Sequence, residues 1–358
     1  MLGYGMKLIK RSAMPQSDID QELVDAAEAG AAAKVSALLA KGADSMCNSS
    51  QALQLAAHNG HAECVRELLP VSEAQVGNSY ALRLAAYGGH VECVRLLLPM
   101  SNPKALDSEA LRIAAQNGNA ECVRLLLPVS HPKARESCAL RLAARNGGAE
   151  CVRLLLAVSD AKDRESESLR WAASNGHVEC VRMLLPVSDA KANESESLRA
   201  ASQNGHAECV RMLLPVSDAK ANESEALRDA AGNGHAECVR MLLPVSDPRG
   251  RGSLALRWAA HNGQEECVRM LLPVSSPLCE IDGLLEEVFE SGRANVAALL
   301  VEEDSRLLDG VDLSKCLAAA IENGHEEMAS YLSSIIDQNE LSSAALDAAR
   351  RTLGAARL

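Results

Sequence analysis

Residues 110–130 read ALRIAAQNGNAECVRLLLPVS, and close copies of this stretch recur along the chain with a period of 29 residues. Eight cysteines mark the period: Cys64, Cys93, Cys122, Cys151, Cys180, Cys209, Cys238 and Cys267. A unit of this length has too little volume to enclose a core of its own, so successive copies must stack and share one continuous core. The sequence therefore predicts one elongated solenoid in place of two or three globular domains, and a solenoid binds along its length.

Each unit contains the signals for two short helices, as the unit from Asn193 to Asn222 illustrates. Asn193 followed by Glu196 is typical of a capping box at a helix start. Gly205 suits the left-handed residue that ends this first helix. A second apolar helix is predicted over 207–214, and Pro215 prevents its continuation. Helices this short are unstable alone in water, so their order must come from neighbouring units.

The repeated string LAAxNGHAECVRLLL resembles the core of an ankyrin repeat, whose usual wording is close to TPLHLAAxxGHxEVVKLLLxxGADVN. The resemblance covers the units that start near Leu53, Leu82, Leu111, Leu140, Leu169, Leu198, Leu227 and Leu256. A degenerate unit at 23–49 precedes them, and two drifted units follow at 284–301 and 317–335. The resemblance implies an all-α fold, an α-solenoid of eleven stacked helix-turn-helix ankyrin-like repeats.

These units depart from the family in length, because ankyrin repeats usually have about 33 residues. The four missing residues fall where the family forms its protruding hairpin, so we expect shortened connecting loops. This loss shifts attention from the hairpin tips to the first helix of each unit. We expect a disordered leader at 1–20, the solenoid at 21–338 and a C-terminal capping helix at 339–358.

Composition narrows the classes of function. The net charge of −12 opposes binding to nucleic acid and to anionic membrane surfaces. The sequence shows neither a signal peptide nor a run long enough to span a membrane. We therefore expect a cytoplasmic protein with reduced cysteines, and export into a host cell is the alternative. The monomer is the favoured oligomeric state.

A His-x-x-Cys spacing occurs in five units and raises the alternative of a thiol-dependent enzyme or redox sensor. A histidine beside a helix start can lower the pKa of a thiol. However, one active site needs one pair, and Asn119, Gly148 and Gln264 replace the histidine in other units. The cysteine also stands where the family wording has a buried valine. We therefore predict structural roles for both residues, no catalytic site, no cofactor and no metal.

Charged residues also recur with the period. Glu63 and Arg66, with their counterparts in later units, are spaced to form ion pairs on one helix. Arginines recur at 83, 112, 141, 170, 199, 228 and 257. A solvated surface with pairs between repeats is the favoured interpretation, and a basic stripe for an acidic ligand is the alternative.

Positions that differ between units point to a binding surface, since an array keeps its framework constant and varies where it recognises a partner. Two such columns lie on the first helix, which lines the concave face in ankyrin-like stacks. From them we predict a partner-binding set: Tyr87, Arg145, Trp171, Asp229 and Trp258. The predicted function is a non-enzymatic scaffold that binds a protein with a neutral or basic surface. A secreted bacterial effector that binds host proteins, and a purely mechanical spacer, are the alternatives.

Overall fold

The computed structural model describes residues 18–276 and 283–337, and every regular element in these ranges is a helix. No strand occurs in them, so the shortened loops form no hairpin ladder there. Two compact units divide the chain, Met1–Asp189 and Ala190–Leu358. The expected leader, apart from the start of α1 at Asp18, and the expected capping helix at 339–358 lie outside the described residues.

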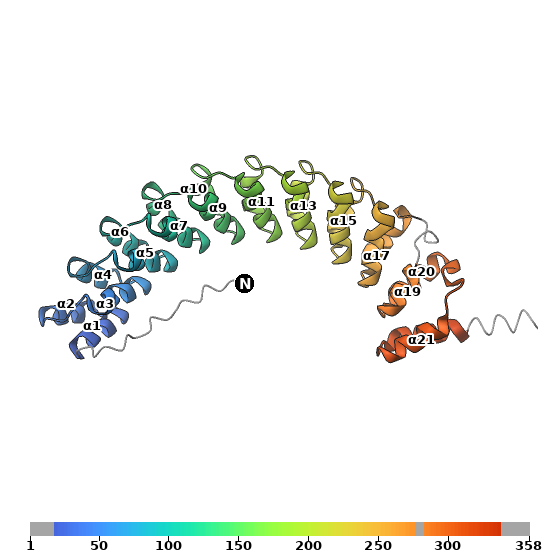
Figure 1. Ribbon diagram of the computed structural model, residues 1–358, viewed down its shortest axis with the longest axis horizontal. Coiled ribbons are helices and arrows are strands. Elements are labelled where there is room, and N and C mark those ends of the chain that lie inside the picture. Colours follow the sequence, from blue (N-terminus) through green and yellow to red (C-terminus); the bar gives the residue numbers. More distant parts are fainter. Residues whose placement is uncertain (1–17, 277–282, 338–358) are drawn as a thin grey trace, which may run out of the picture. The chain divides into compact units, whose positions relative to one another are not determined.

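Unit 1 contains six helix pairs (Figure 1). Their bounds are α1 Asp18–Glu28, α2 Ala32–Ala40, α3 Cys47–His58, α4 Ala62–Leu68, α5 Val76–Gly88, α6 Val91–Leu97, α7 Ala105–Gln116, α8 Ala120–Leu126, α9 Ala134–Arg145, α10 Ala149–Leu156, α11 Asp163–Ser174 and α12 Val178–Leu184. Short 3₁₀ turns follow α4, α6 and α8, where the proline after the second helix stops it.

Unit 2 continues the same alternation of longer and shorter helices. Its helices are α13 Ala192–Gln203, α14 Ala207–Leu213, α15 Ala221–Gly232, α16 Ala236–Leu242, α17 Gly250–His261, α18 Glu265–Leu271, α19 Leu284–Glu290, α20 Ala294–Glu303 and α21 Leu313–Glu322, followed by a helical segment at 326–337.

Within each unit the helices form two layers. First helices pack on first helices, as α5 on α7 in unit 1 and α15 on α17 in unit 2. Second helices pack on second helices in the same way, as α6 on α8 and α14 on α16. The arrangement confirms the prediction of an α-solenoid of stacked helix-turn-helix repeats.

The core lies between the two layers. Leu198 and Ala201 from α13, with Cys209, Val210 and Leu213 from α14, are fully buried, and the equivalent residues of other repeats are buried too. The small alanines let the first helices approach closely, while the leucines fill the space between the layers. Each repeat within the array thus packs against the repeat before it and the repeat after it, as the 29-residue period predicts.

A turn of left-handed backbone opens each of these first helices, from α3 to α17. In α13, Asn193, Glu194 and Ser195 have φ of 48°, 56° and 62°. The predicted capping box at Asn193 and Glu196 is therefore wrong: no side chain caps this helix, and Glu196 instead pairs with Arg199 at 2.8 Å. The left-handed residues displace Asn193 from the geometry of an N-cap. Gly205, with φ of 73°, does end the helix as predicted.

Tertiary hydrogen bonds stabilise this unfavourable turn, which costs about 1–2 kcal/mol per non-glycine residue. The serine that ends each turn is at most 3% exposed. Its Oγ accepts a hydrogen bond, 2.7 to 3.1 Å long, from a backbone N–H 23 residues further on, as Ser137 does from Asp160. In unit 1 an arginine also donates to a carbonyl of the turn, as Arg141 does to Arg135 at 2.9 Å.

Replacement of Ser50 with alanine should lower the free energy of unfolding by about 1 kcal/mol, because the backbone N–H of Glu73 would lose its buried acceptor. Ser49 is the matched control: it lies in the same left-handed turn but is exposed. Ser49→Ala should change the free energy by no more than about 0.5 kcal/mol. Urea unfolding followed by circular dichroism measures both, and equal effects would contradict the role assigned to the buried hydroxyl.

Candidate functional site

The histidines of the His-x-x-Cys pairs connect neighbouring repeats. Nε2 of His61 lies 3.0 Å from the carbonyl oxygen of Glu28, and Nε2 of His90 lies 2.9 Å from that of His58. Because a carbonyl can only accept, Nε2 must carry the hydrogen in each case. Asn119 replaces histidine in the next repeat, and its Nδ2 donates to the equivalent carbonyl, that of Tyr87, at 3.0 Å. These contacts support the structural role predicted for the histidines.

The repeated cysteines lie in the core, each at most 1% exposed. Burial, reinforced by the glutamate that precedes each cysteine, raises the pKa of several thiols to about 11: Cys93, Cys122, Cys151, Cys209, Cys238 and Cys267. A nucleophilic cysteine needs the opposite, an accessible thiolate with a lowered pKa. The geometry therefore gives no support to a thiol enzyme built on these pairs.

Neither a metal-binding cluster nor a membrane-spanning helix occurs in the part of the chain that the structure describes. Residues 18–276 and 283–337 contain no group of three or more His, Cys, Asp or Glu side chains placed to hold a metal ion. Within these ranges, no helix combines the length and the apolar character that crossing a bilayer requires.

The first helices of unit 1 carry three of the predicted partner-binding residues. Tyr87 in α5 is 47% exposed, and its ring stacks on that of His58 with centroids 6.4 Å apart. Arg145 at the end of α9 is exposed, whereas Trp171 in α11 is half-buried. The guanidinium of Arg145 lies over the Trp171 ring, 4.7 Å from its centroid, so the structure brings these two predicted residues together.

Trp171 belongs to a cluster centred on Glu167, which is only 15% exposed at its side chain. Oε1 of Glu167 accepts hydrogen bonds from Trp171 Nε1 at 3.1 Å and from Arg170 Nη2 at 3.0 Å. Oε2 is paired with Arg141 and lies 3.7 Å from Nε of Arg164. Residues of the chain itself thus cover the face of the Trp171 ring, through Arg145, and accept the hydrogen bond from its indole nitrogen, through Glu167.

The charge of Glu167 follows from this setting. Burial by itself would raise the pKa of the carboxyl group, but hydrogen bonds from Arg141 and Trp171 and the nearby charges outweigh it. The pKa of Glu167 therefore lies below its ordinary value, and the group is ionised at neutral pH.

In unit 2, Asp229 lies in α15 and is half-buried. Burial raises the pKa of its carboxyl group, although Arg199, 3.7 Å away, acts in the opposite direction. Arg199 also contacts Glu196 and Glu225, so Asp229 takes part in a paired network within the first-helix layer. A partner would meet little isolated negative charge at Asp229.

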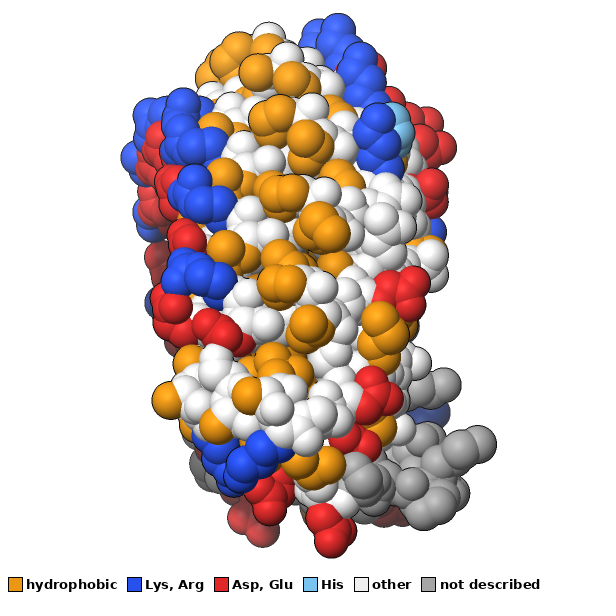
Figure 2. All heavy atoms as spheres, turned by 90° about the vertical axis from the view of Figure 1, so that its left-hand side faces the viewer, with side chains coloured by type: hydrophobic (Ala, Val, Ile, Leu, Met, Phe, Trp, Pro, Cys, Tyr) orange, Lys and Arg blue, Asp and Glu red, His pale blue; other side chains and the backbone are white. Residues whose placement is uncertain are grey.

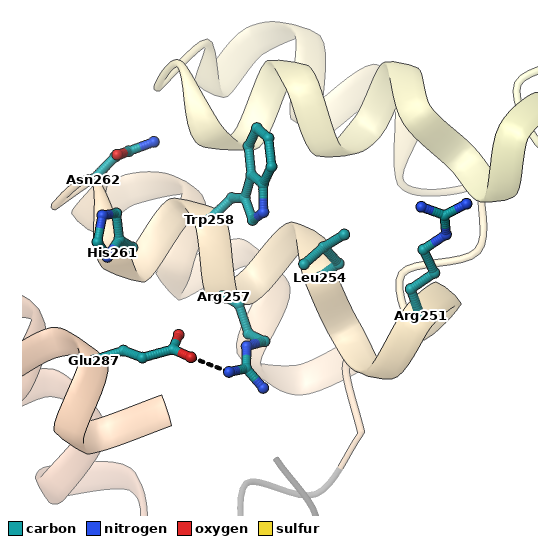
Figure 3. A pocket seen from close by; sticks show the side chains of 7 residues that line it. All are labelled: Arg251, Leu254, Arg257, Trp258, His261, Asn262 and Glu287. Atoms are coloured by element: carbon teal, nitrogen blue, oxygen red, sulfur yellow. Dashed lines mark hydrogen bonds and ion pairs between the residues drawn. The ribbon is translucent and has the colours of Figure 1, made fainter. Parts of the chain in front are cut away.

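Trp258 in α17 lines a groove of about 680 Å³ and is 49% exposed. The remaining lining residues are Arg251, Leu254, Arg257, His261, Asn262 and Glu287 (Figure 3). The ring packs against α15 at Gly232, where a Cβ would lie 3.1 Å from Cε3 of the tryptophan. The absence of a side chain at 232 thus lets Trp258 lie on the neighbouring helix while one part of it faces solvent.

Comparison of one equivalent position across the repeats could not reveal which residues surround each tryptophan. Sequence analysis identified both tryptophans but missed Glu167, which accepts a hydrogen bond from Trp171, and Leu254 and Glu287, which line the groove beside Trp258. The missed signal lies four residues before each tryptophan, where Glu167 stands in one repeat and Leu254 in another.

A second exposed surface was also missed. Figure 2 shows hydrophobic side chains in a column on one face of the molecule, with charged side chains on both sides. The exposed large hydrophobic residues of unit 1 include one that follows the second helix in each of five repeats: Val71, Met100, Val129, Val158 and Val187. Most of these residues belong to the recurring sequence PVS. The prediction of a binding surface relied on positions that vary between units, so it did not include this nearly constant position.

Comparisons with known proteins agree with the geometry. A family model described as ankyrin repeats (3 copies) matches residues 23–108, 82–165, 111–196, 140–222 and 198–282, which together span well over half of the chain. Among solved structures, the human ASB11 ankyrin repeat domain is similar at 21% identity and a TM-score of 0.41, over 65% of this chain and 95% of that one. No curated protein sequence matches the chain.

The buried thiols should resist alkylation by iodoacetamide at pH 8 until the protein unfolds, whereas the half-buried Cys138 should react faster. Because burial raises the folded pKa above the ordinary value of 9.0, the fold favours the neutral thiol. The thiols therefore contribute stability that is complete below about pH 9 and lost as the pH rises toward 11. Mass spectrometry of the labelled peptides measures the rates, and fast labelling of Cys93, which belongs to a His-x-x-Cys pair, in the folded protein would support the thiol enzyme.

Proposed function

Because the chain belongs to the ankyrin-repeat family, whose repeats generally mediate protein–protein interactions, we propose that it is a non-enzymatic scaffold that binds a protein partner through its first-helix layer. The first-helix layer is the exposed surface of the odd-numbered helices, which are α1, α3, α5, α7, α9 and α11 in unit 1 and α13, α15, α17, α19 and α21 in unit 2.

The observation that carries the proposal is the exposure of large aromatic side chains on this layer. Trp258 and Tyr87 are 49% and 47% exposed, although the chain has only seven aromatic residues. Tryptophan, tyrosine and arginine are the residues most often found at binding hot spots, and the two aromatic residues bury a large area at low entropic cost. The groove beside Trp258 offers a place where such burial can occur.

The predicted residues contribute unequally to this proposal. In unit 1, Tyr87 and Arg145 face solvent, while Trp171 acts mainly by holding Arg145 in place. In unit 2, Trp258 is the principal contact, and Asp229 is largely engaged with Arg199. The net charge of −12 supports a partner with a neutral or basic surface and disfavours nucleic acid. We place the activity in the cytoplasm, with export into a host cell as the alternative.

Replacement of Trp258 with alanine should weaken partner binding at least about tenfold, the effect expected for a hot-spot residue. The partner is identified by affinity capture and mass spectrometry, and its affinity is then measured by calorimetry. Val245→Ser is the matched control, since Val245 is similarly exposed but follows the second helix α16.

Tyr87→Ala tests unit 1 in the same way. Retention of full affinity by both aromatic variants, with weakened binding in Val245→Ser, would move the interaction to the opposite layer. Melting temperatures close to that of the wild-type protein show that the variants remain folded.

A further inference from the structure

The two tryptophans occupy equivalent positions, because 258 − 171 = 87 and three periods of 29 residues also make 87. The same shift of 87 residues relates the side chains around Trp171 to those around Trp258. It pairs Arg141 with Arg228, Arg164 with Arg251, Glu167 with Leu254 and Arg170 with Arg257. All four groups that contact Glu167 therefore have a counterpart in unit 2, but the carboxylate itself has none.

Arg228, the counterpart of Arg141, keeps one nitrogen without a hydrogen-bond partner. Arg228 is 9% exposed, and its Nη2 pairs with Glu225 at 3.2 Å. Its Nη1 is buried and has no hydrogen-bond partner, whereas Nη1 of the equivalent Arg141 binds Glu167. Leu254, in the place of Glu167, has no atom that can accept from Arg228 or from the indole N–H of Trp258.

The groove is lined by Leu254, which stands in the place of Glu167, and by the counterparts of three of the four groups that contact Glu167; Arg228 is not among its lining residues. Leu254, Trp258, Arg251 and Arg257 all line it, with Trp258 and Leu254 on neighbouring turns of α17 (Figure 3). Arg251 is also paired with Glu223, and Arg257 with Glu287. The pair at Arg251 does not prevent a second carboxylate from binding, because its counterpart Arg164 contacts Glu136 at 3.3 Å while it lies 3.7 Å from Glu167. Arg257, which points toward Glu287, would exchange that partner for the new carboxylate.

We propose that the unit 2 groove binds the carboxylate of a glutamate or aspartate side chain presented by the partner protein. The carboxylate would take the place that Glu167 fills in unit 1, between the Arg251 and Arg257 guanidinium groups and the Trp258 indole N–H. Trp258 and Leu254 would contact the apolar stem beside it. This inference rests on the proposed function and deepens it, since it names one feature of a partner whose surface is otherwise neutral or basic.

A cation is the less suitable occupant of this groove. In unit 1 the guanidinium of Arg145 covers the tryptophan ring, but Gly232 stands at the equivalent position in unit 2. The Trp258 ring approaches Gly232 so closely that it already occupies the space of that side chain. The place of the carboxylate, in contrast, opens to the groove.

The test uses the full chain labelled with nitrogen-15 at its two tryptophan indoles, with Trp171→Phe to assign the Trp258 signal. The probes are acetylated and amidated Leu-Glu-Leu and Leu-Gln-Leu peptides. The glutamate peptide should shift the indole N–H signal of Trp258 and leave that of Trp171 in place. The glutamine peptide should bind at least about tenfold more weakly, because the charge-assisted hydrogen bonds are lost. Equal responses to both peptides, or none to either, would overturn the proposal.

A substitution supplies the carboxylate from the chain itself. Leu254→Glu should shift the Trp258 signal toward that of Trp171 and abolish the response to the glutamate peptide. Leu254→Gln, the uncharged control, should leave the Trp258 signal near its wild-type position. A Trp258 signal that is the same in both variants would contradict the assigned carboxylate position.

The two proposals fail in different ways. Partner capture that depends on Trp258 without any glutamate response overturns only the carboxylate site. A glutamate response in a protein whose partner binding does not depend on Trp258 would show a carboxylate site in the groove, but it would overturn both the first-helix interaction at Trp258 and the assignment of the carboxylate to the partner.

Discussion

The helices of this chain are too short to be stable alone, so contacts between neighbouring repeats hold the whole structure together. Second helices such as α4 and α14 have only 7 residues, whereas an isolated helix is marginal below about 12–15 residues. Leucine, alanine, valine and cysteine side chains from adjacent repeats share one core. Polar contacts repeat with the same period: Ser50 accepts from the N–H of Glu73, and His61 reaches the carbonyl of Glu28. Loss of one repeat would therefore expose both of its neighbours.

The left-handed turn depends on the same contacts. Three successive residues such as Arg135, Glu136 and Ser137 have positive φ, which their own preferences oppose. The buried Ser137 hydroxyl and the Arg141 guanidinium stabilise the turn from outside it. The described residues form no projecting hairpin, which supports the proposal that recognition occurs on the first-helix layer.

One framework produces two different tryptophan environments. The guanidinium of Arg145 covers the face of the Trp171 ring, and Glu167 accepts a hydrogen bond from its indole nitrogen. At the equivalent positions around Trp258, Gly232 and Leu254 leave the ring half exposed beside a groove. Two differences between equivalent positions thus replace a self-contained cluster with a half-exposed ring beside a groove, the surface that we propose receives a partner.

The sequence by itself determined the period, the helix pairs, the burial of the repeated cysteines and the glycine that ends each first helix, because these follow from local pattern and volume. It also identified Tyr87 and Trp258 as variable aromatic residues. Only the tertiary structure decided that Asn193 lies in a left-handed turn and not at a helix cap, since the stabilising groups lie in other parts of the repeat array. Only the tertiary structure showed that Trp171 is half-buried whereas Trp258 is exposed. The accessibility of a side chain depends on residues in the neighbouring repeat, and those residues become its neighbours only when the repeats stack.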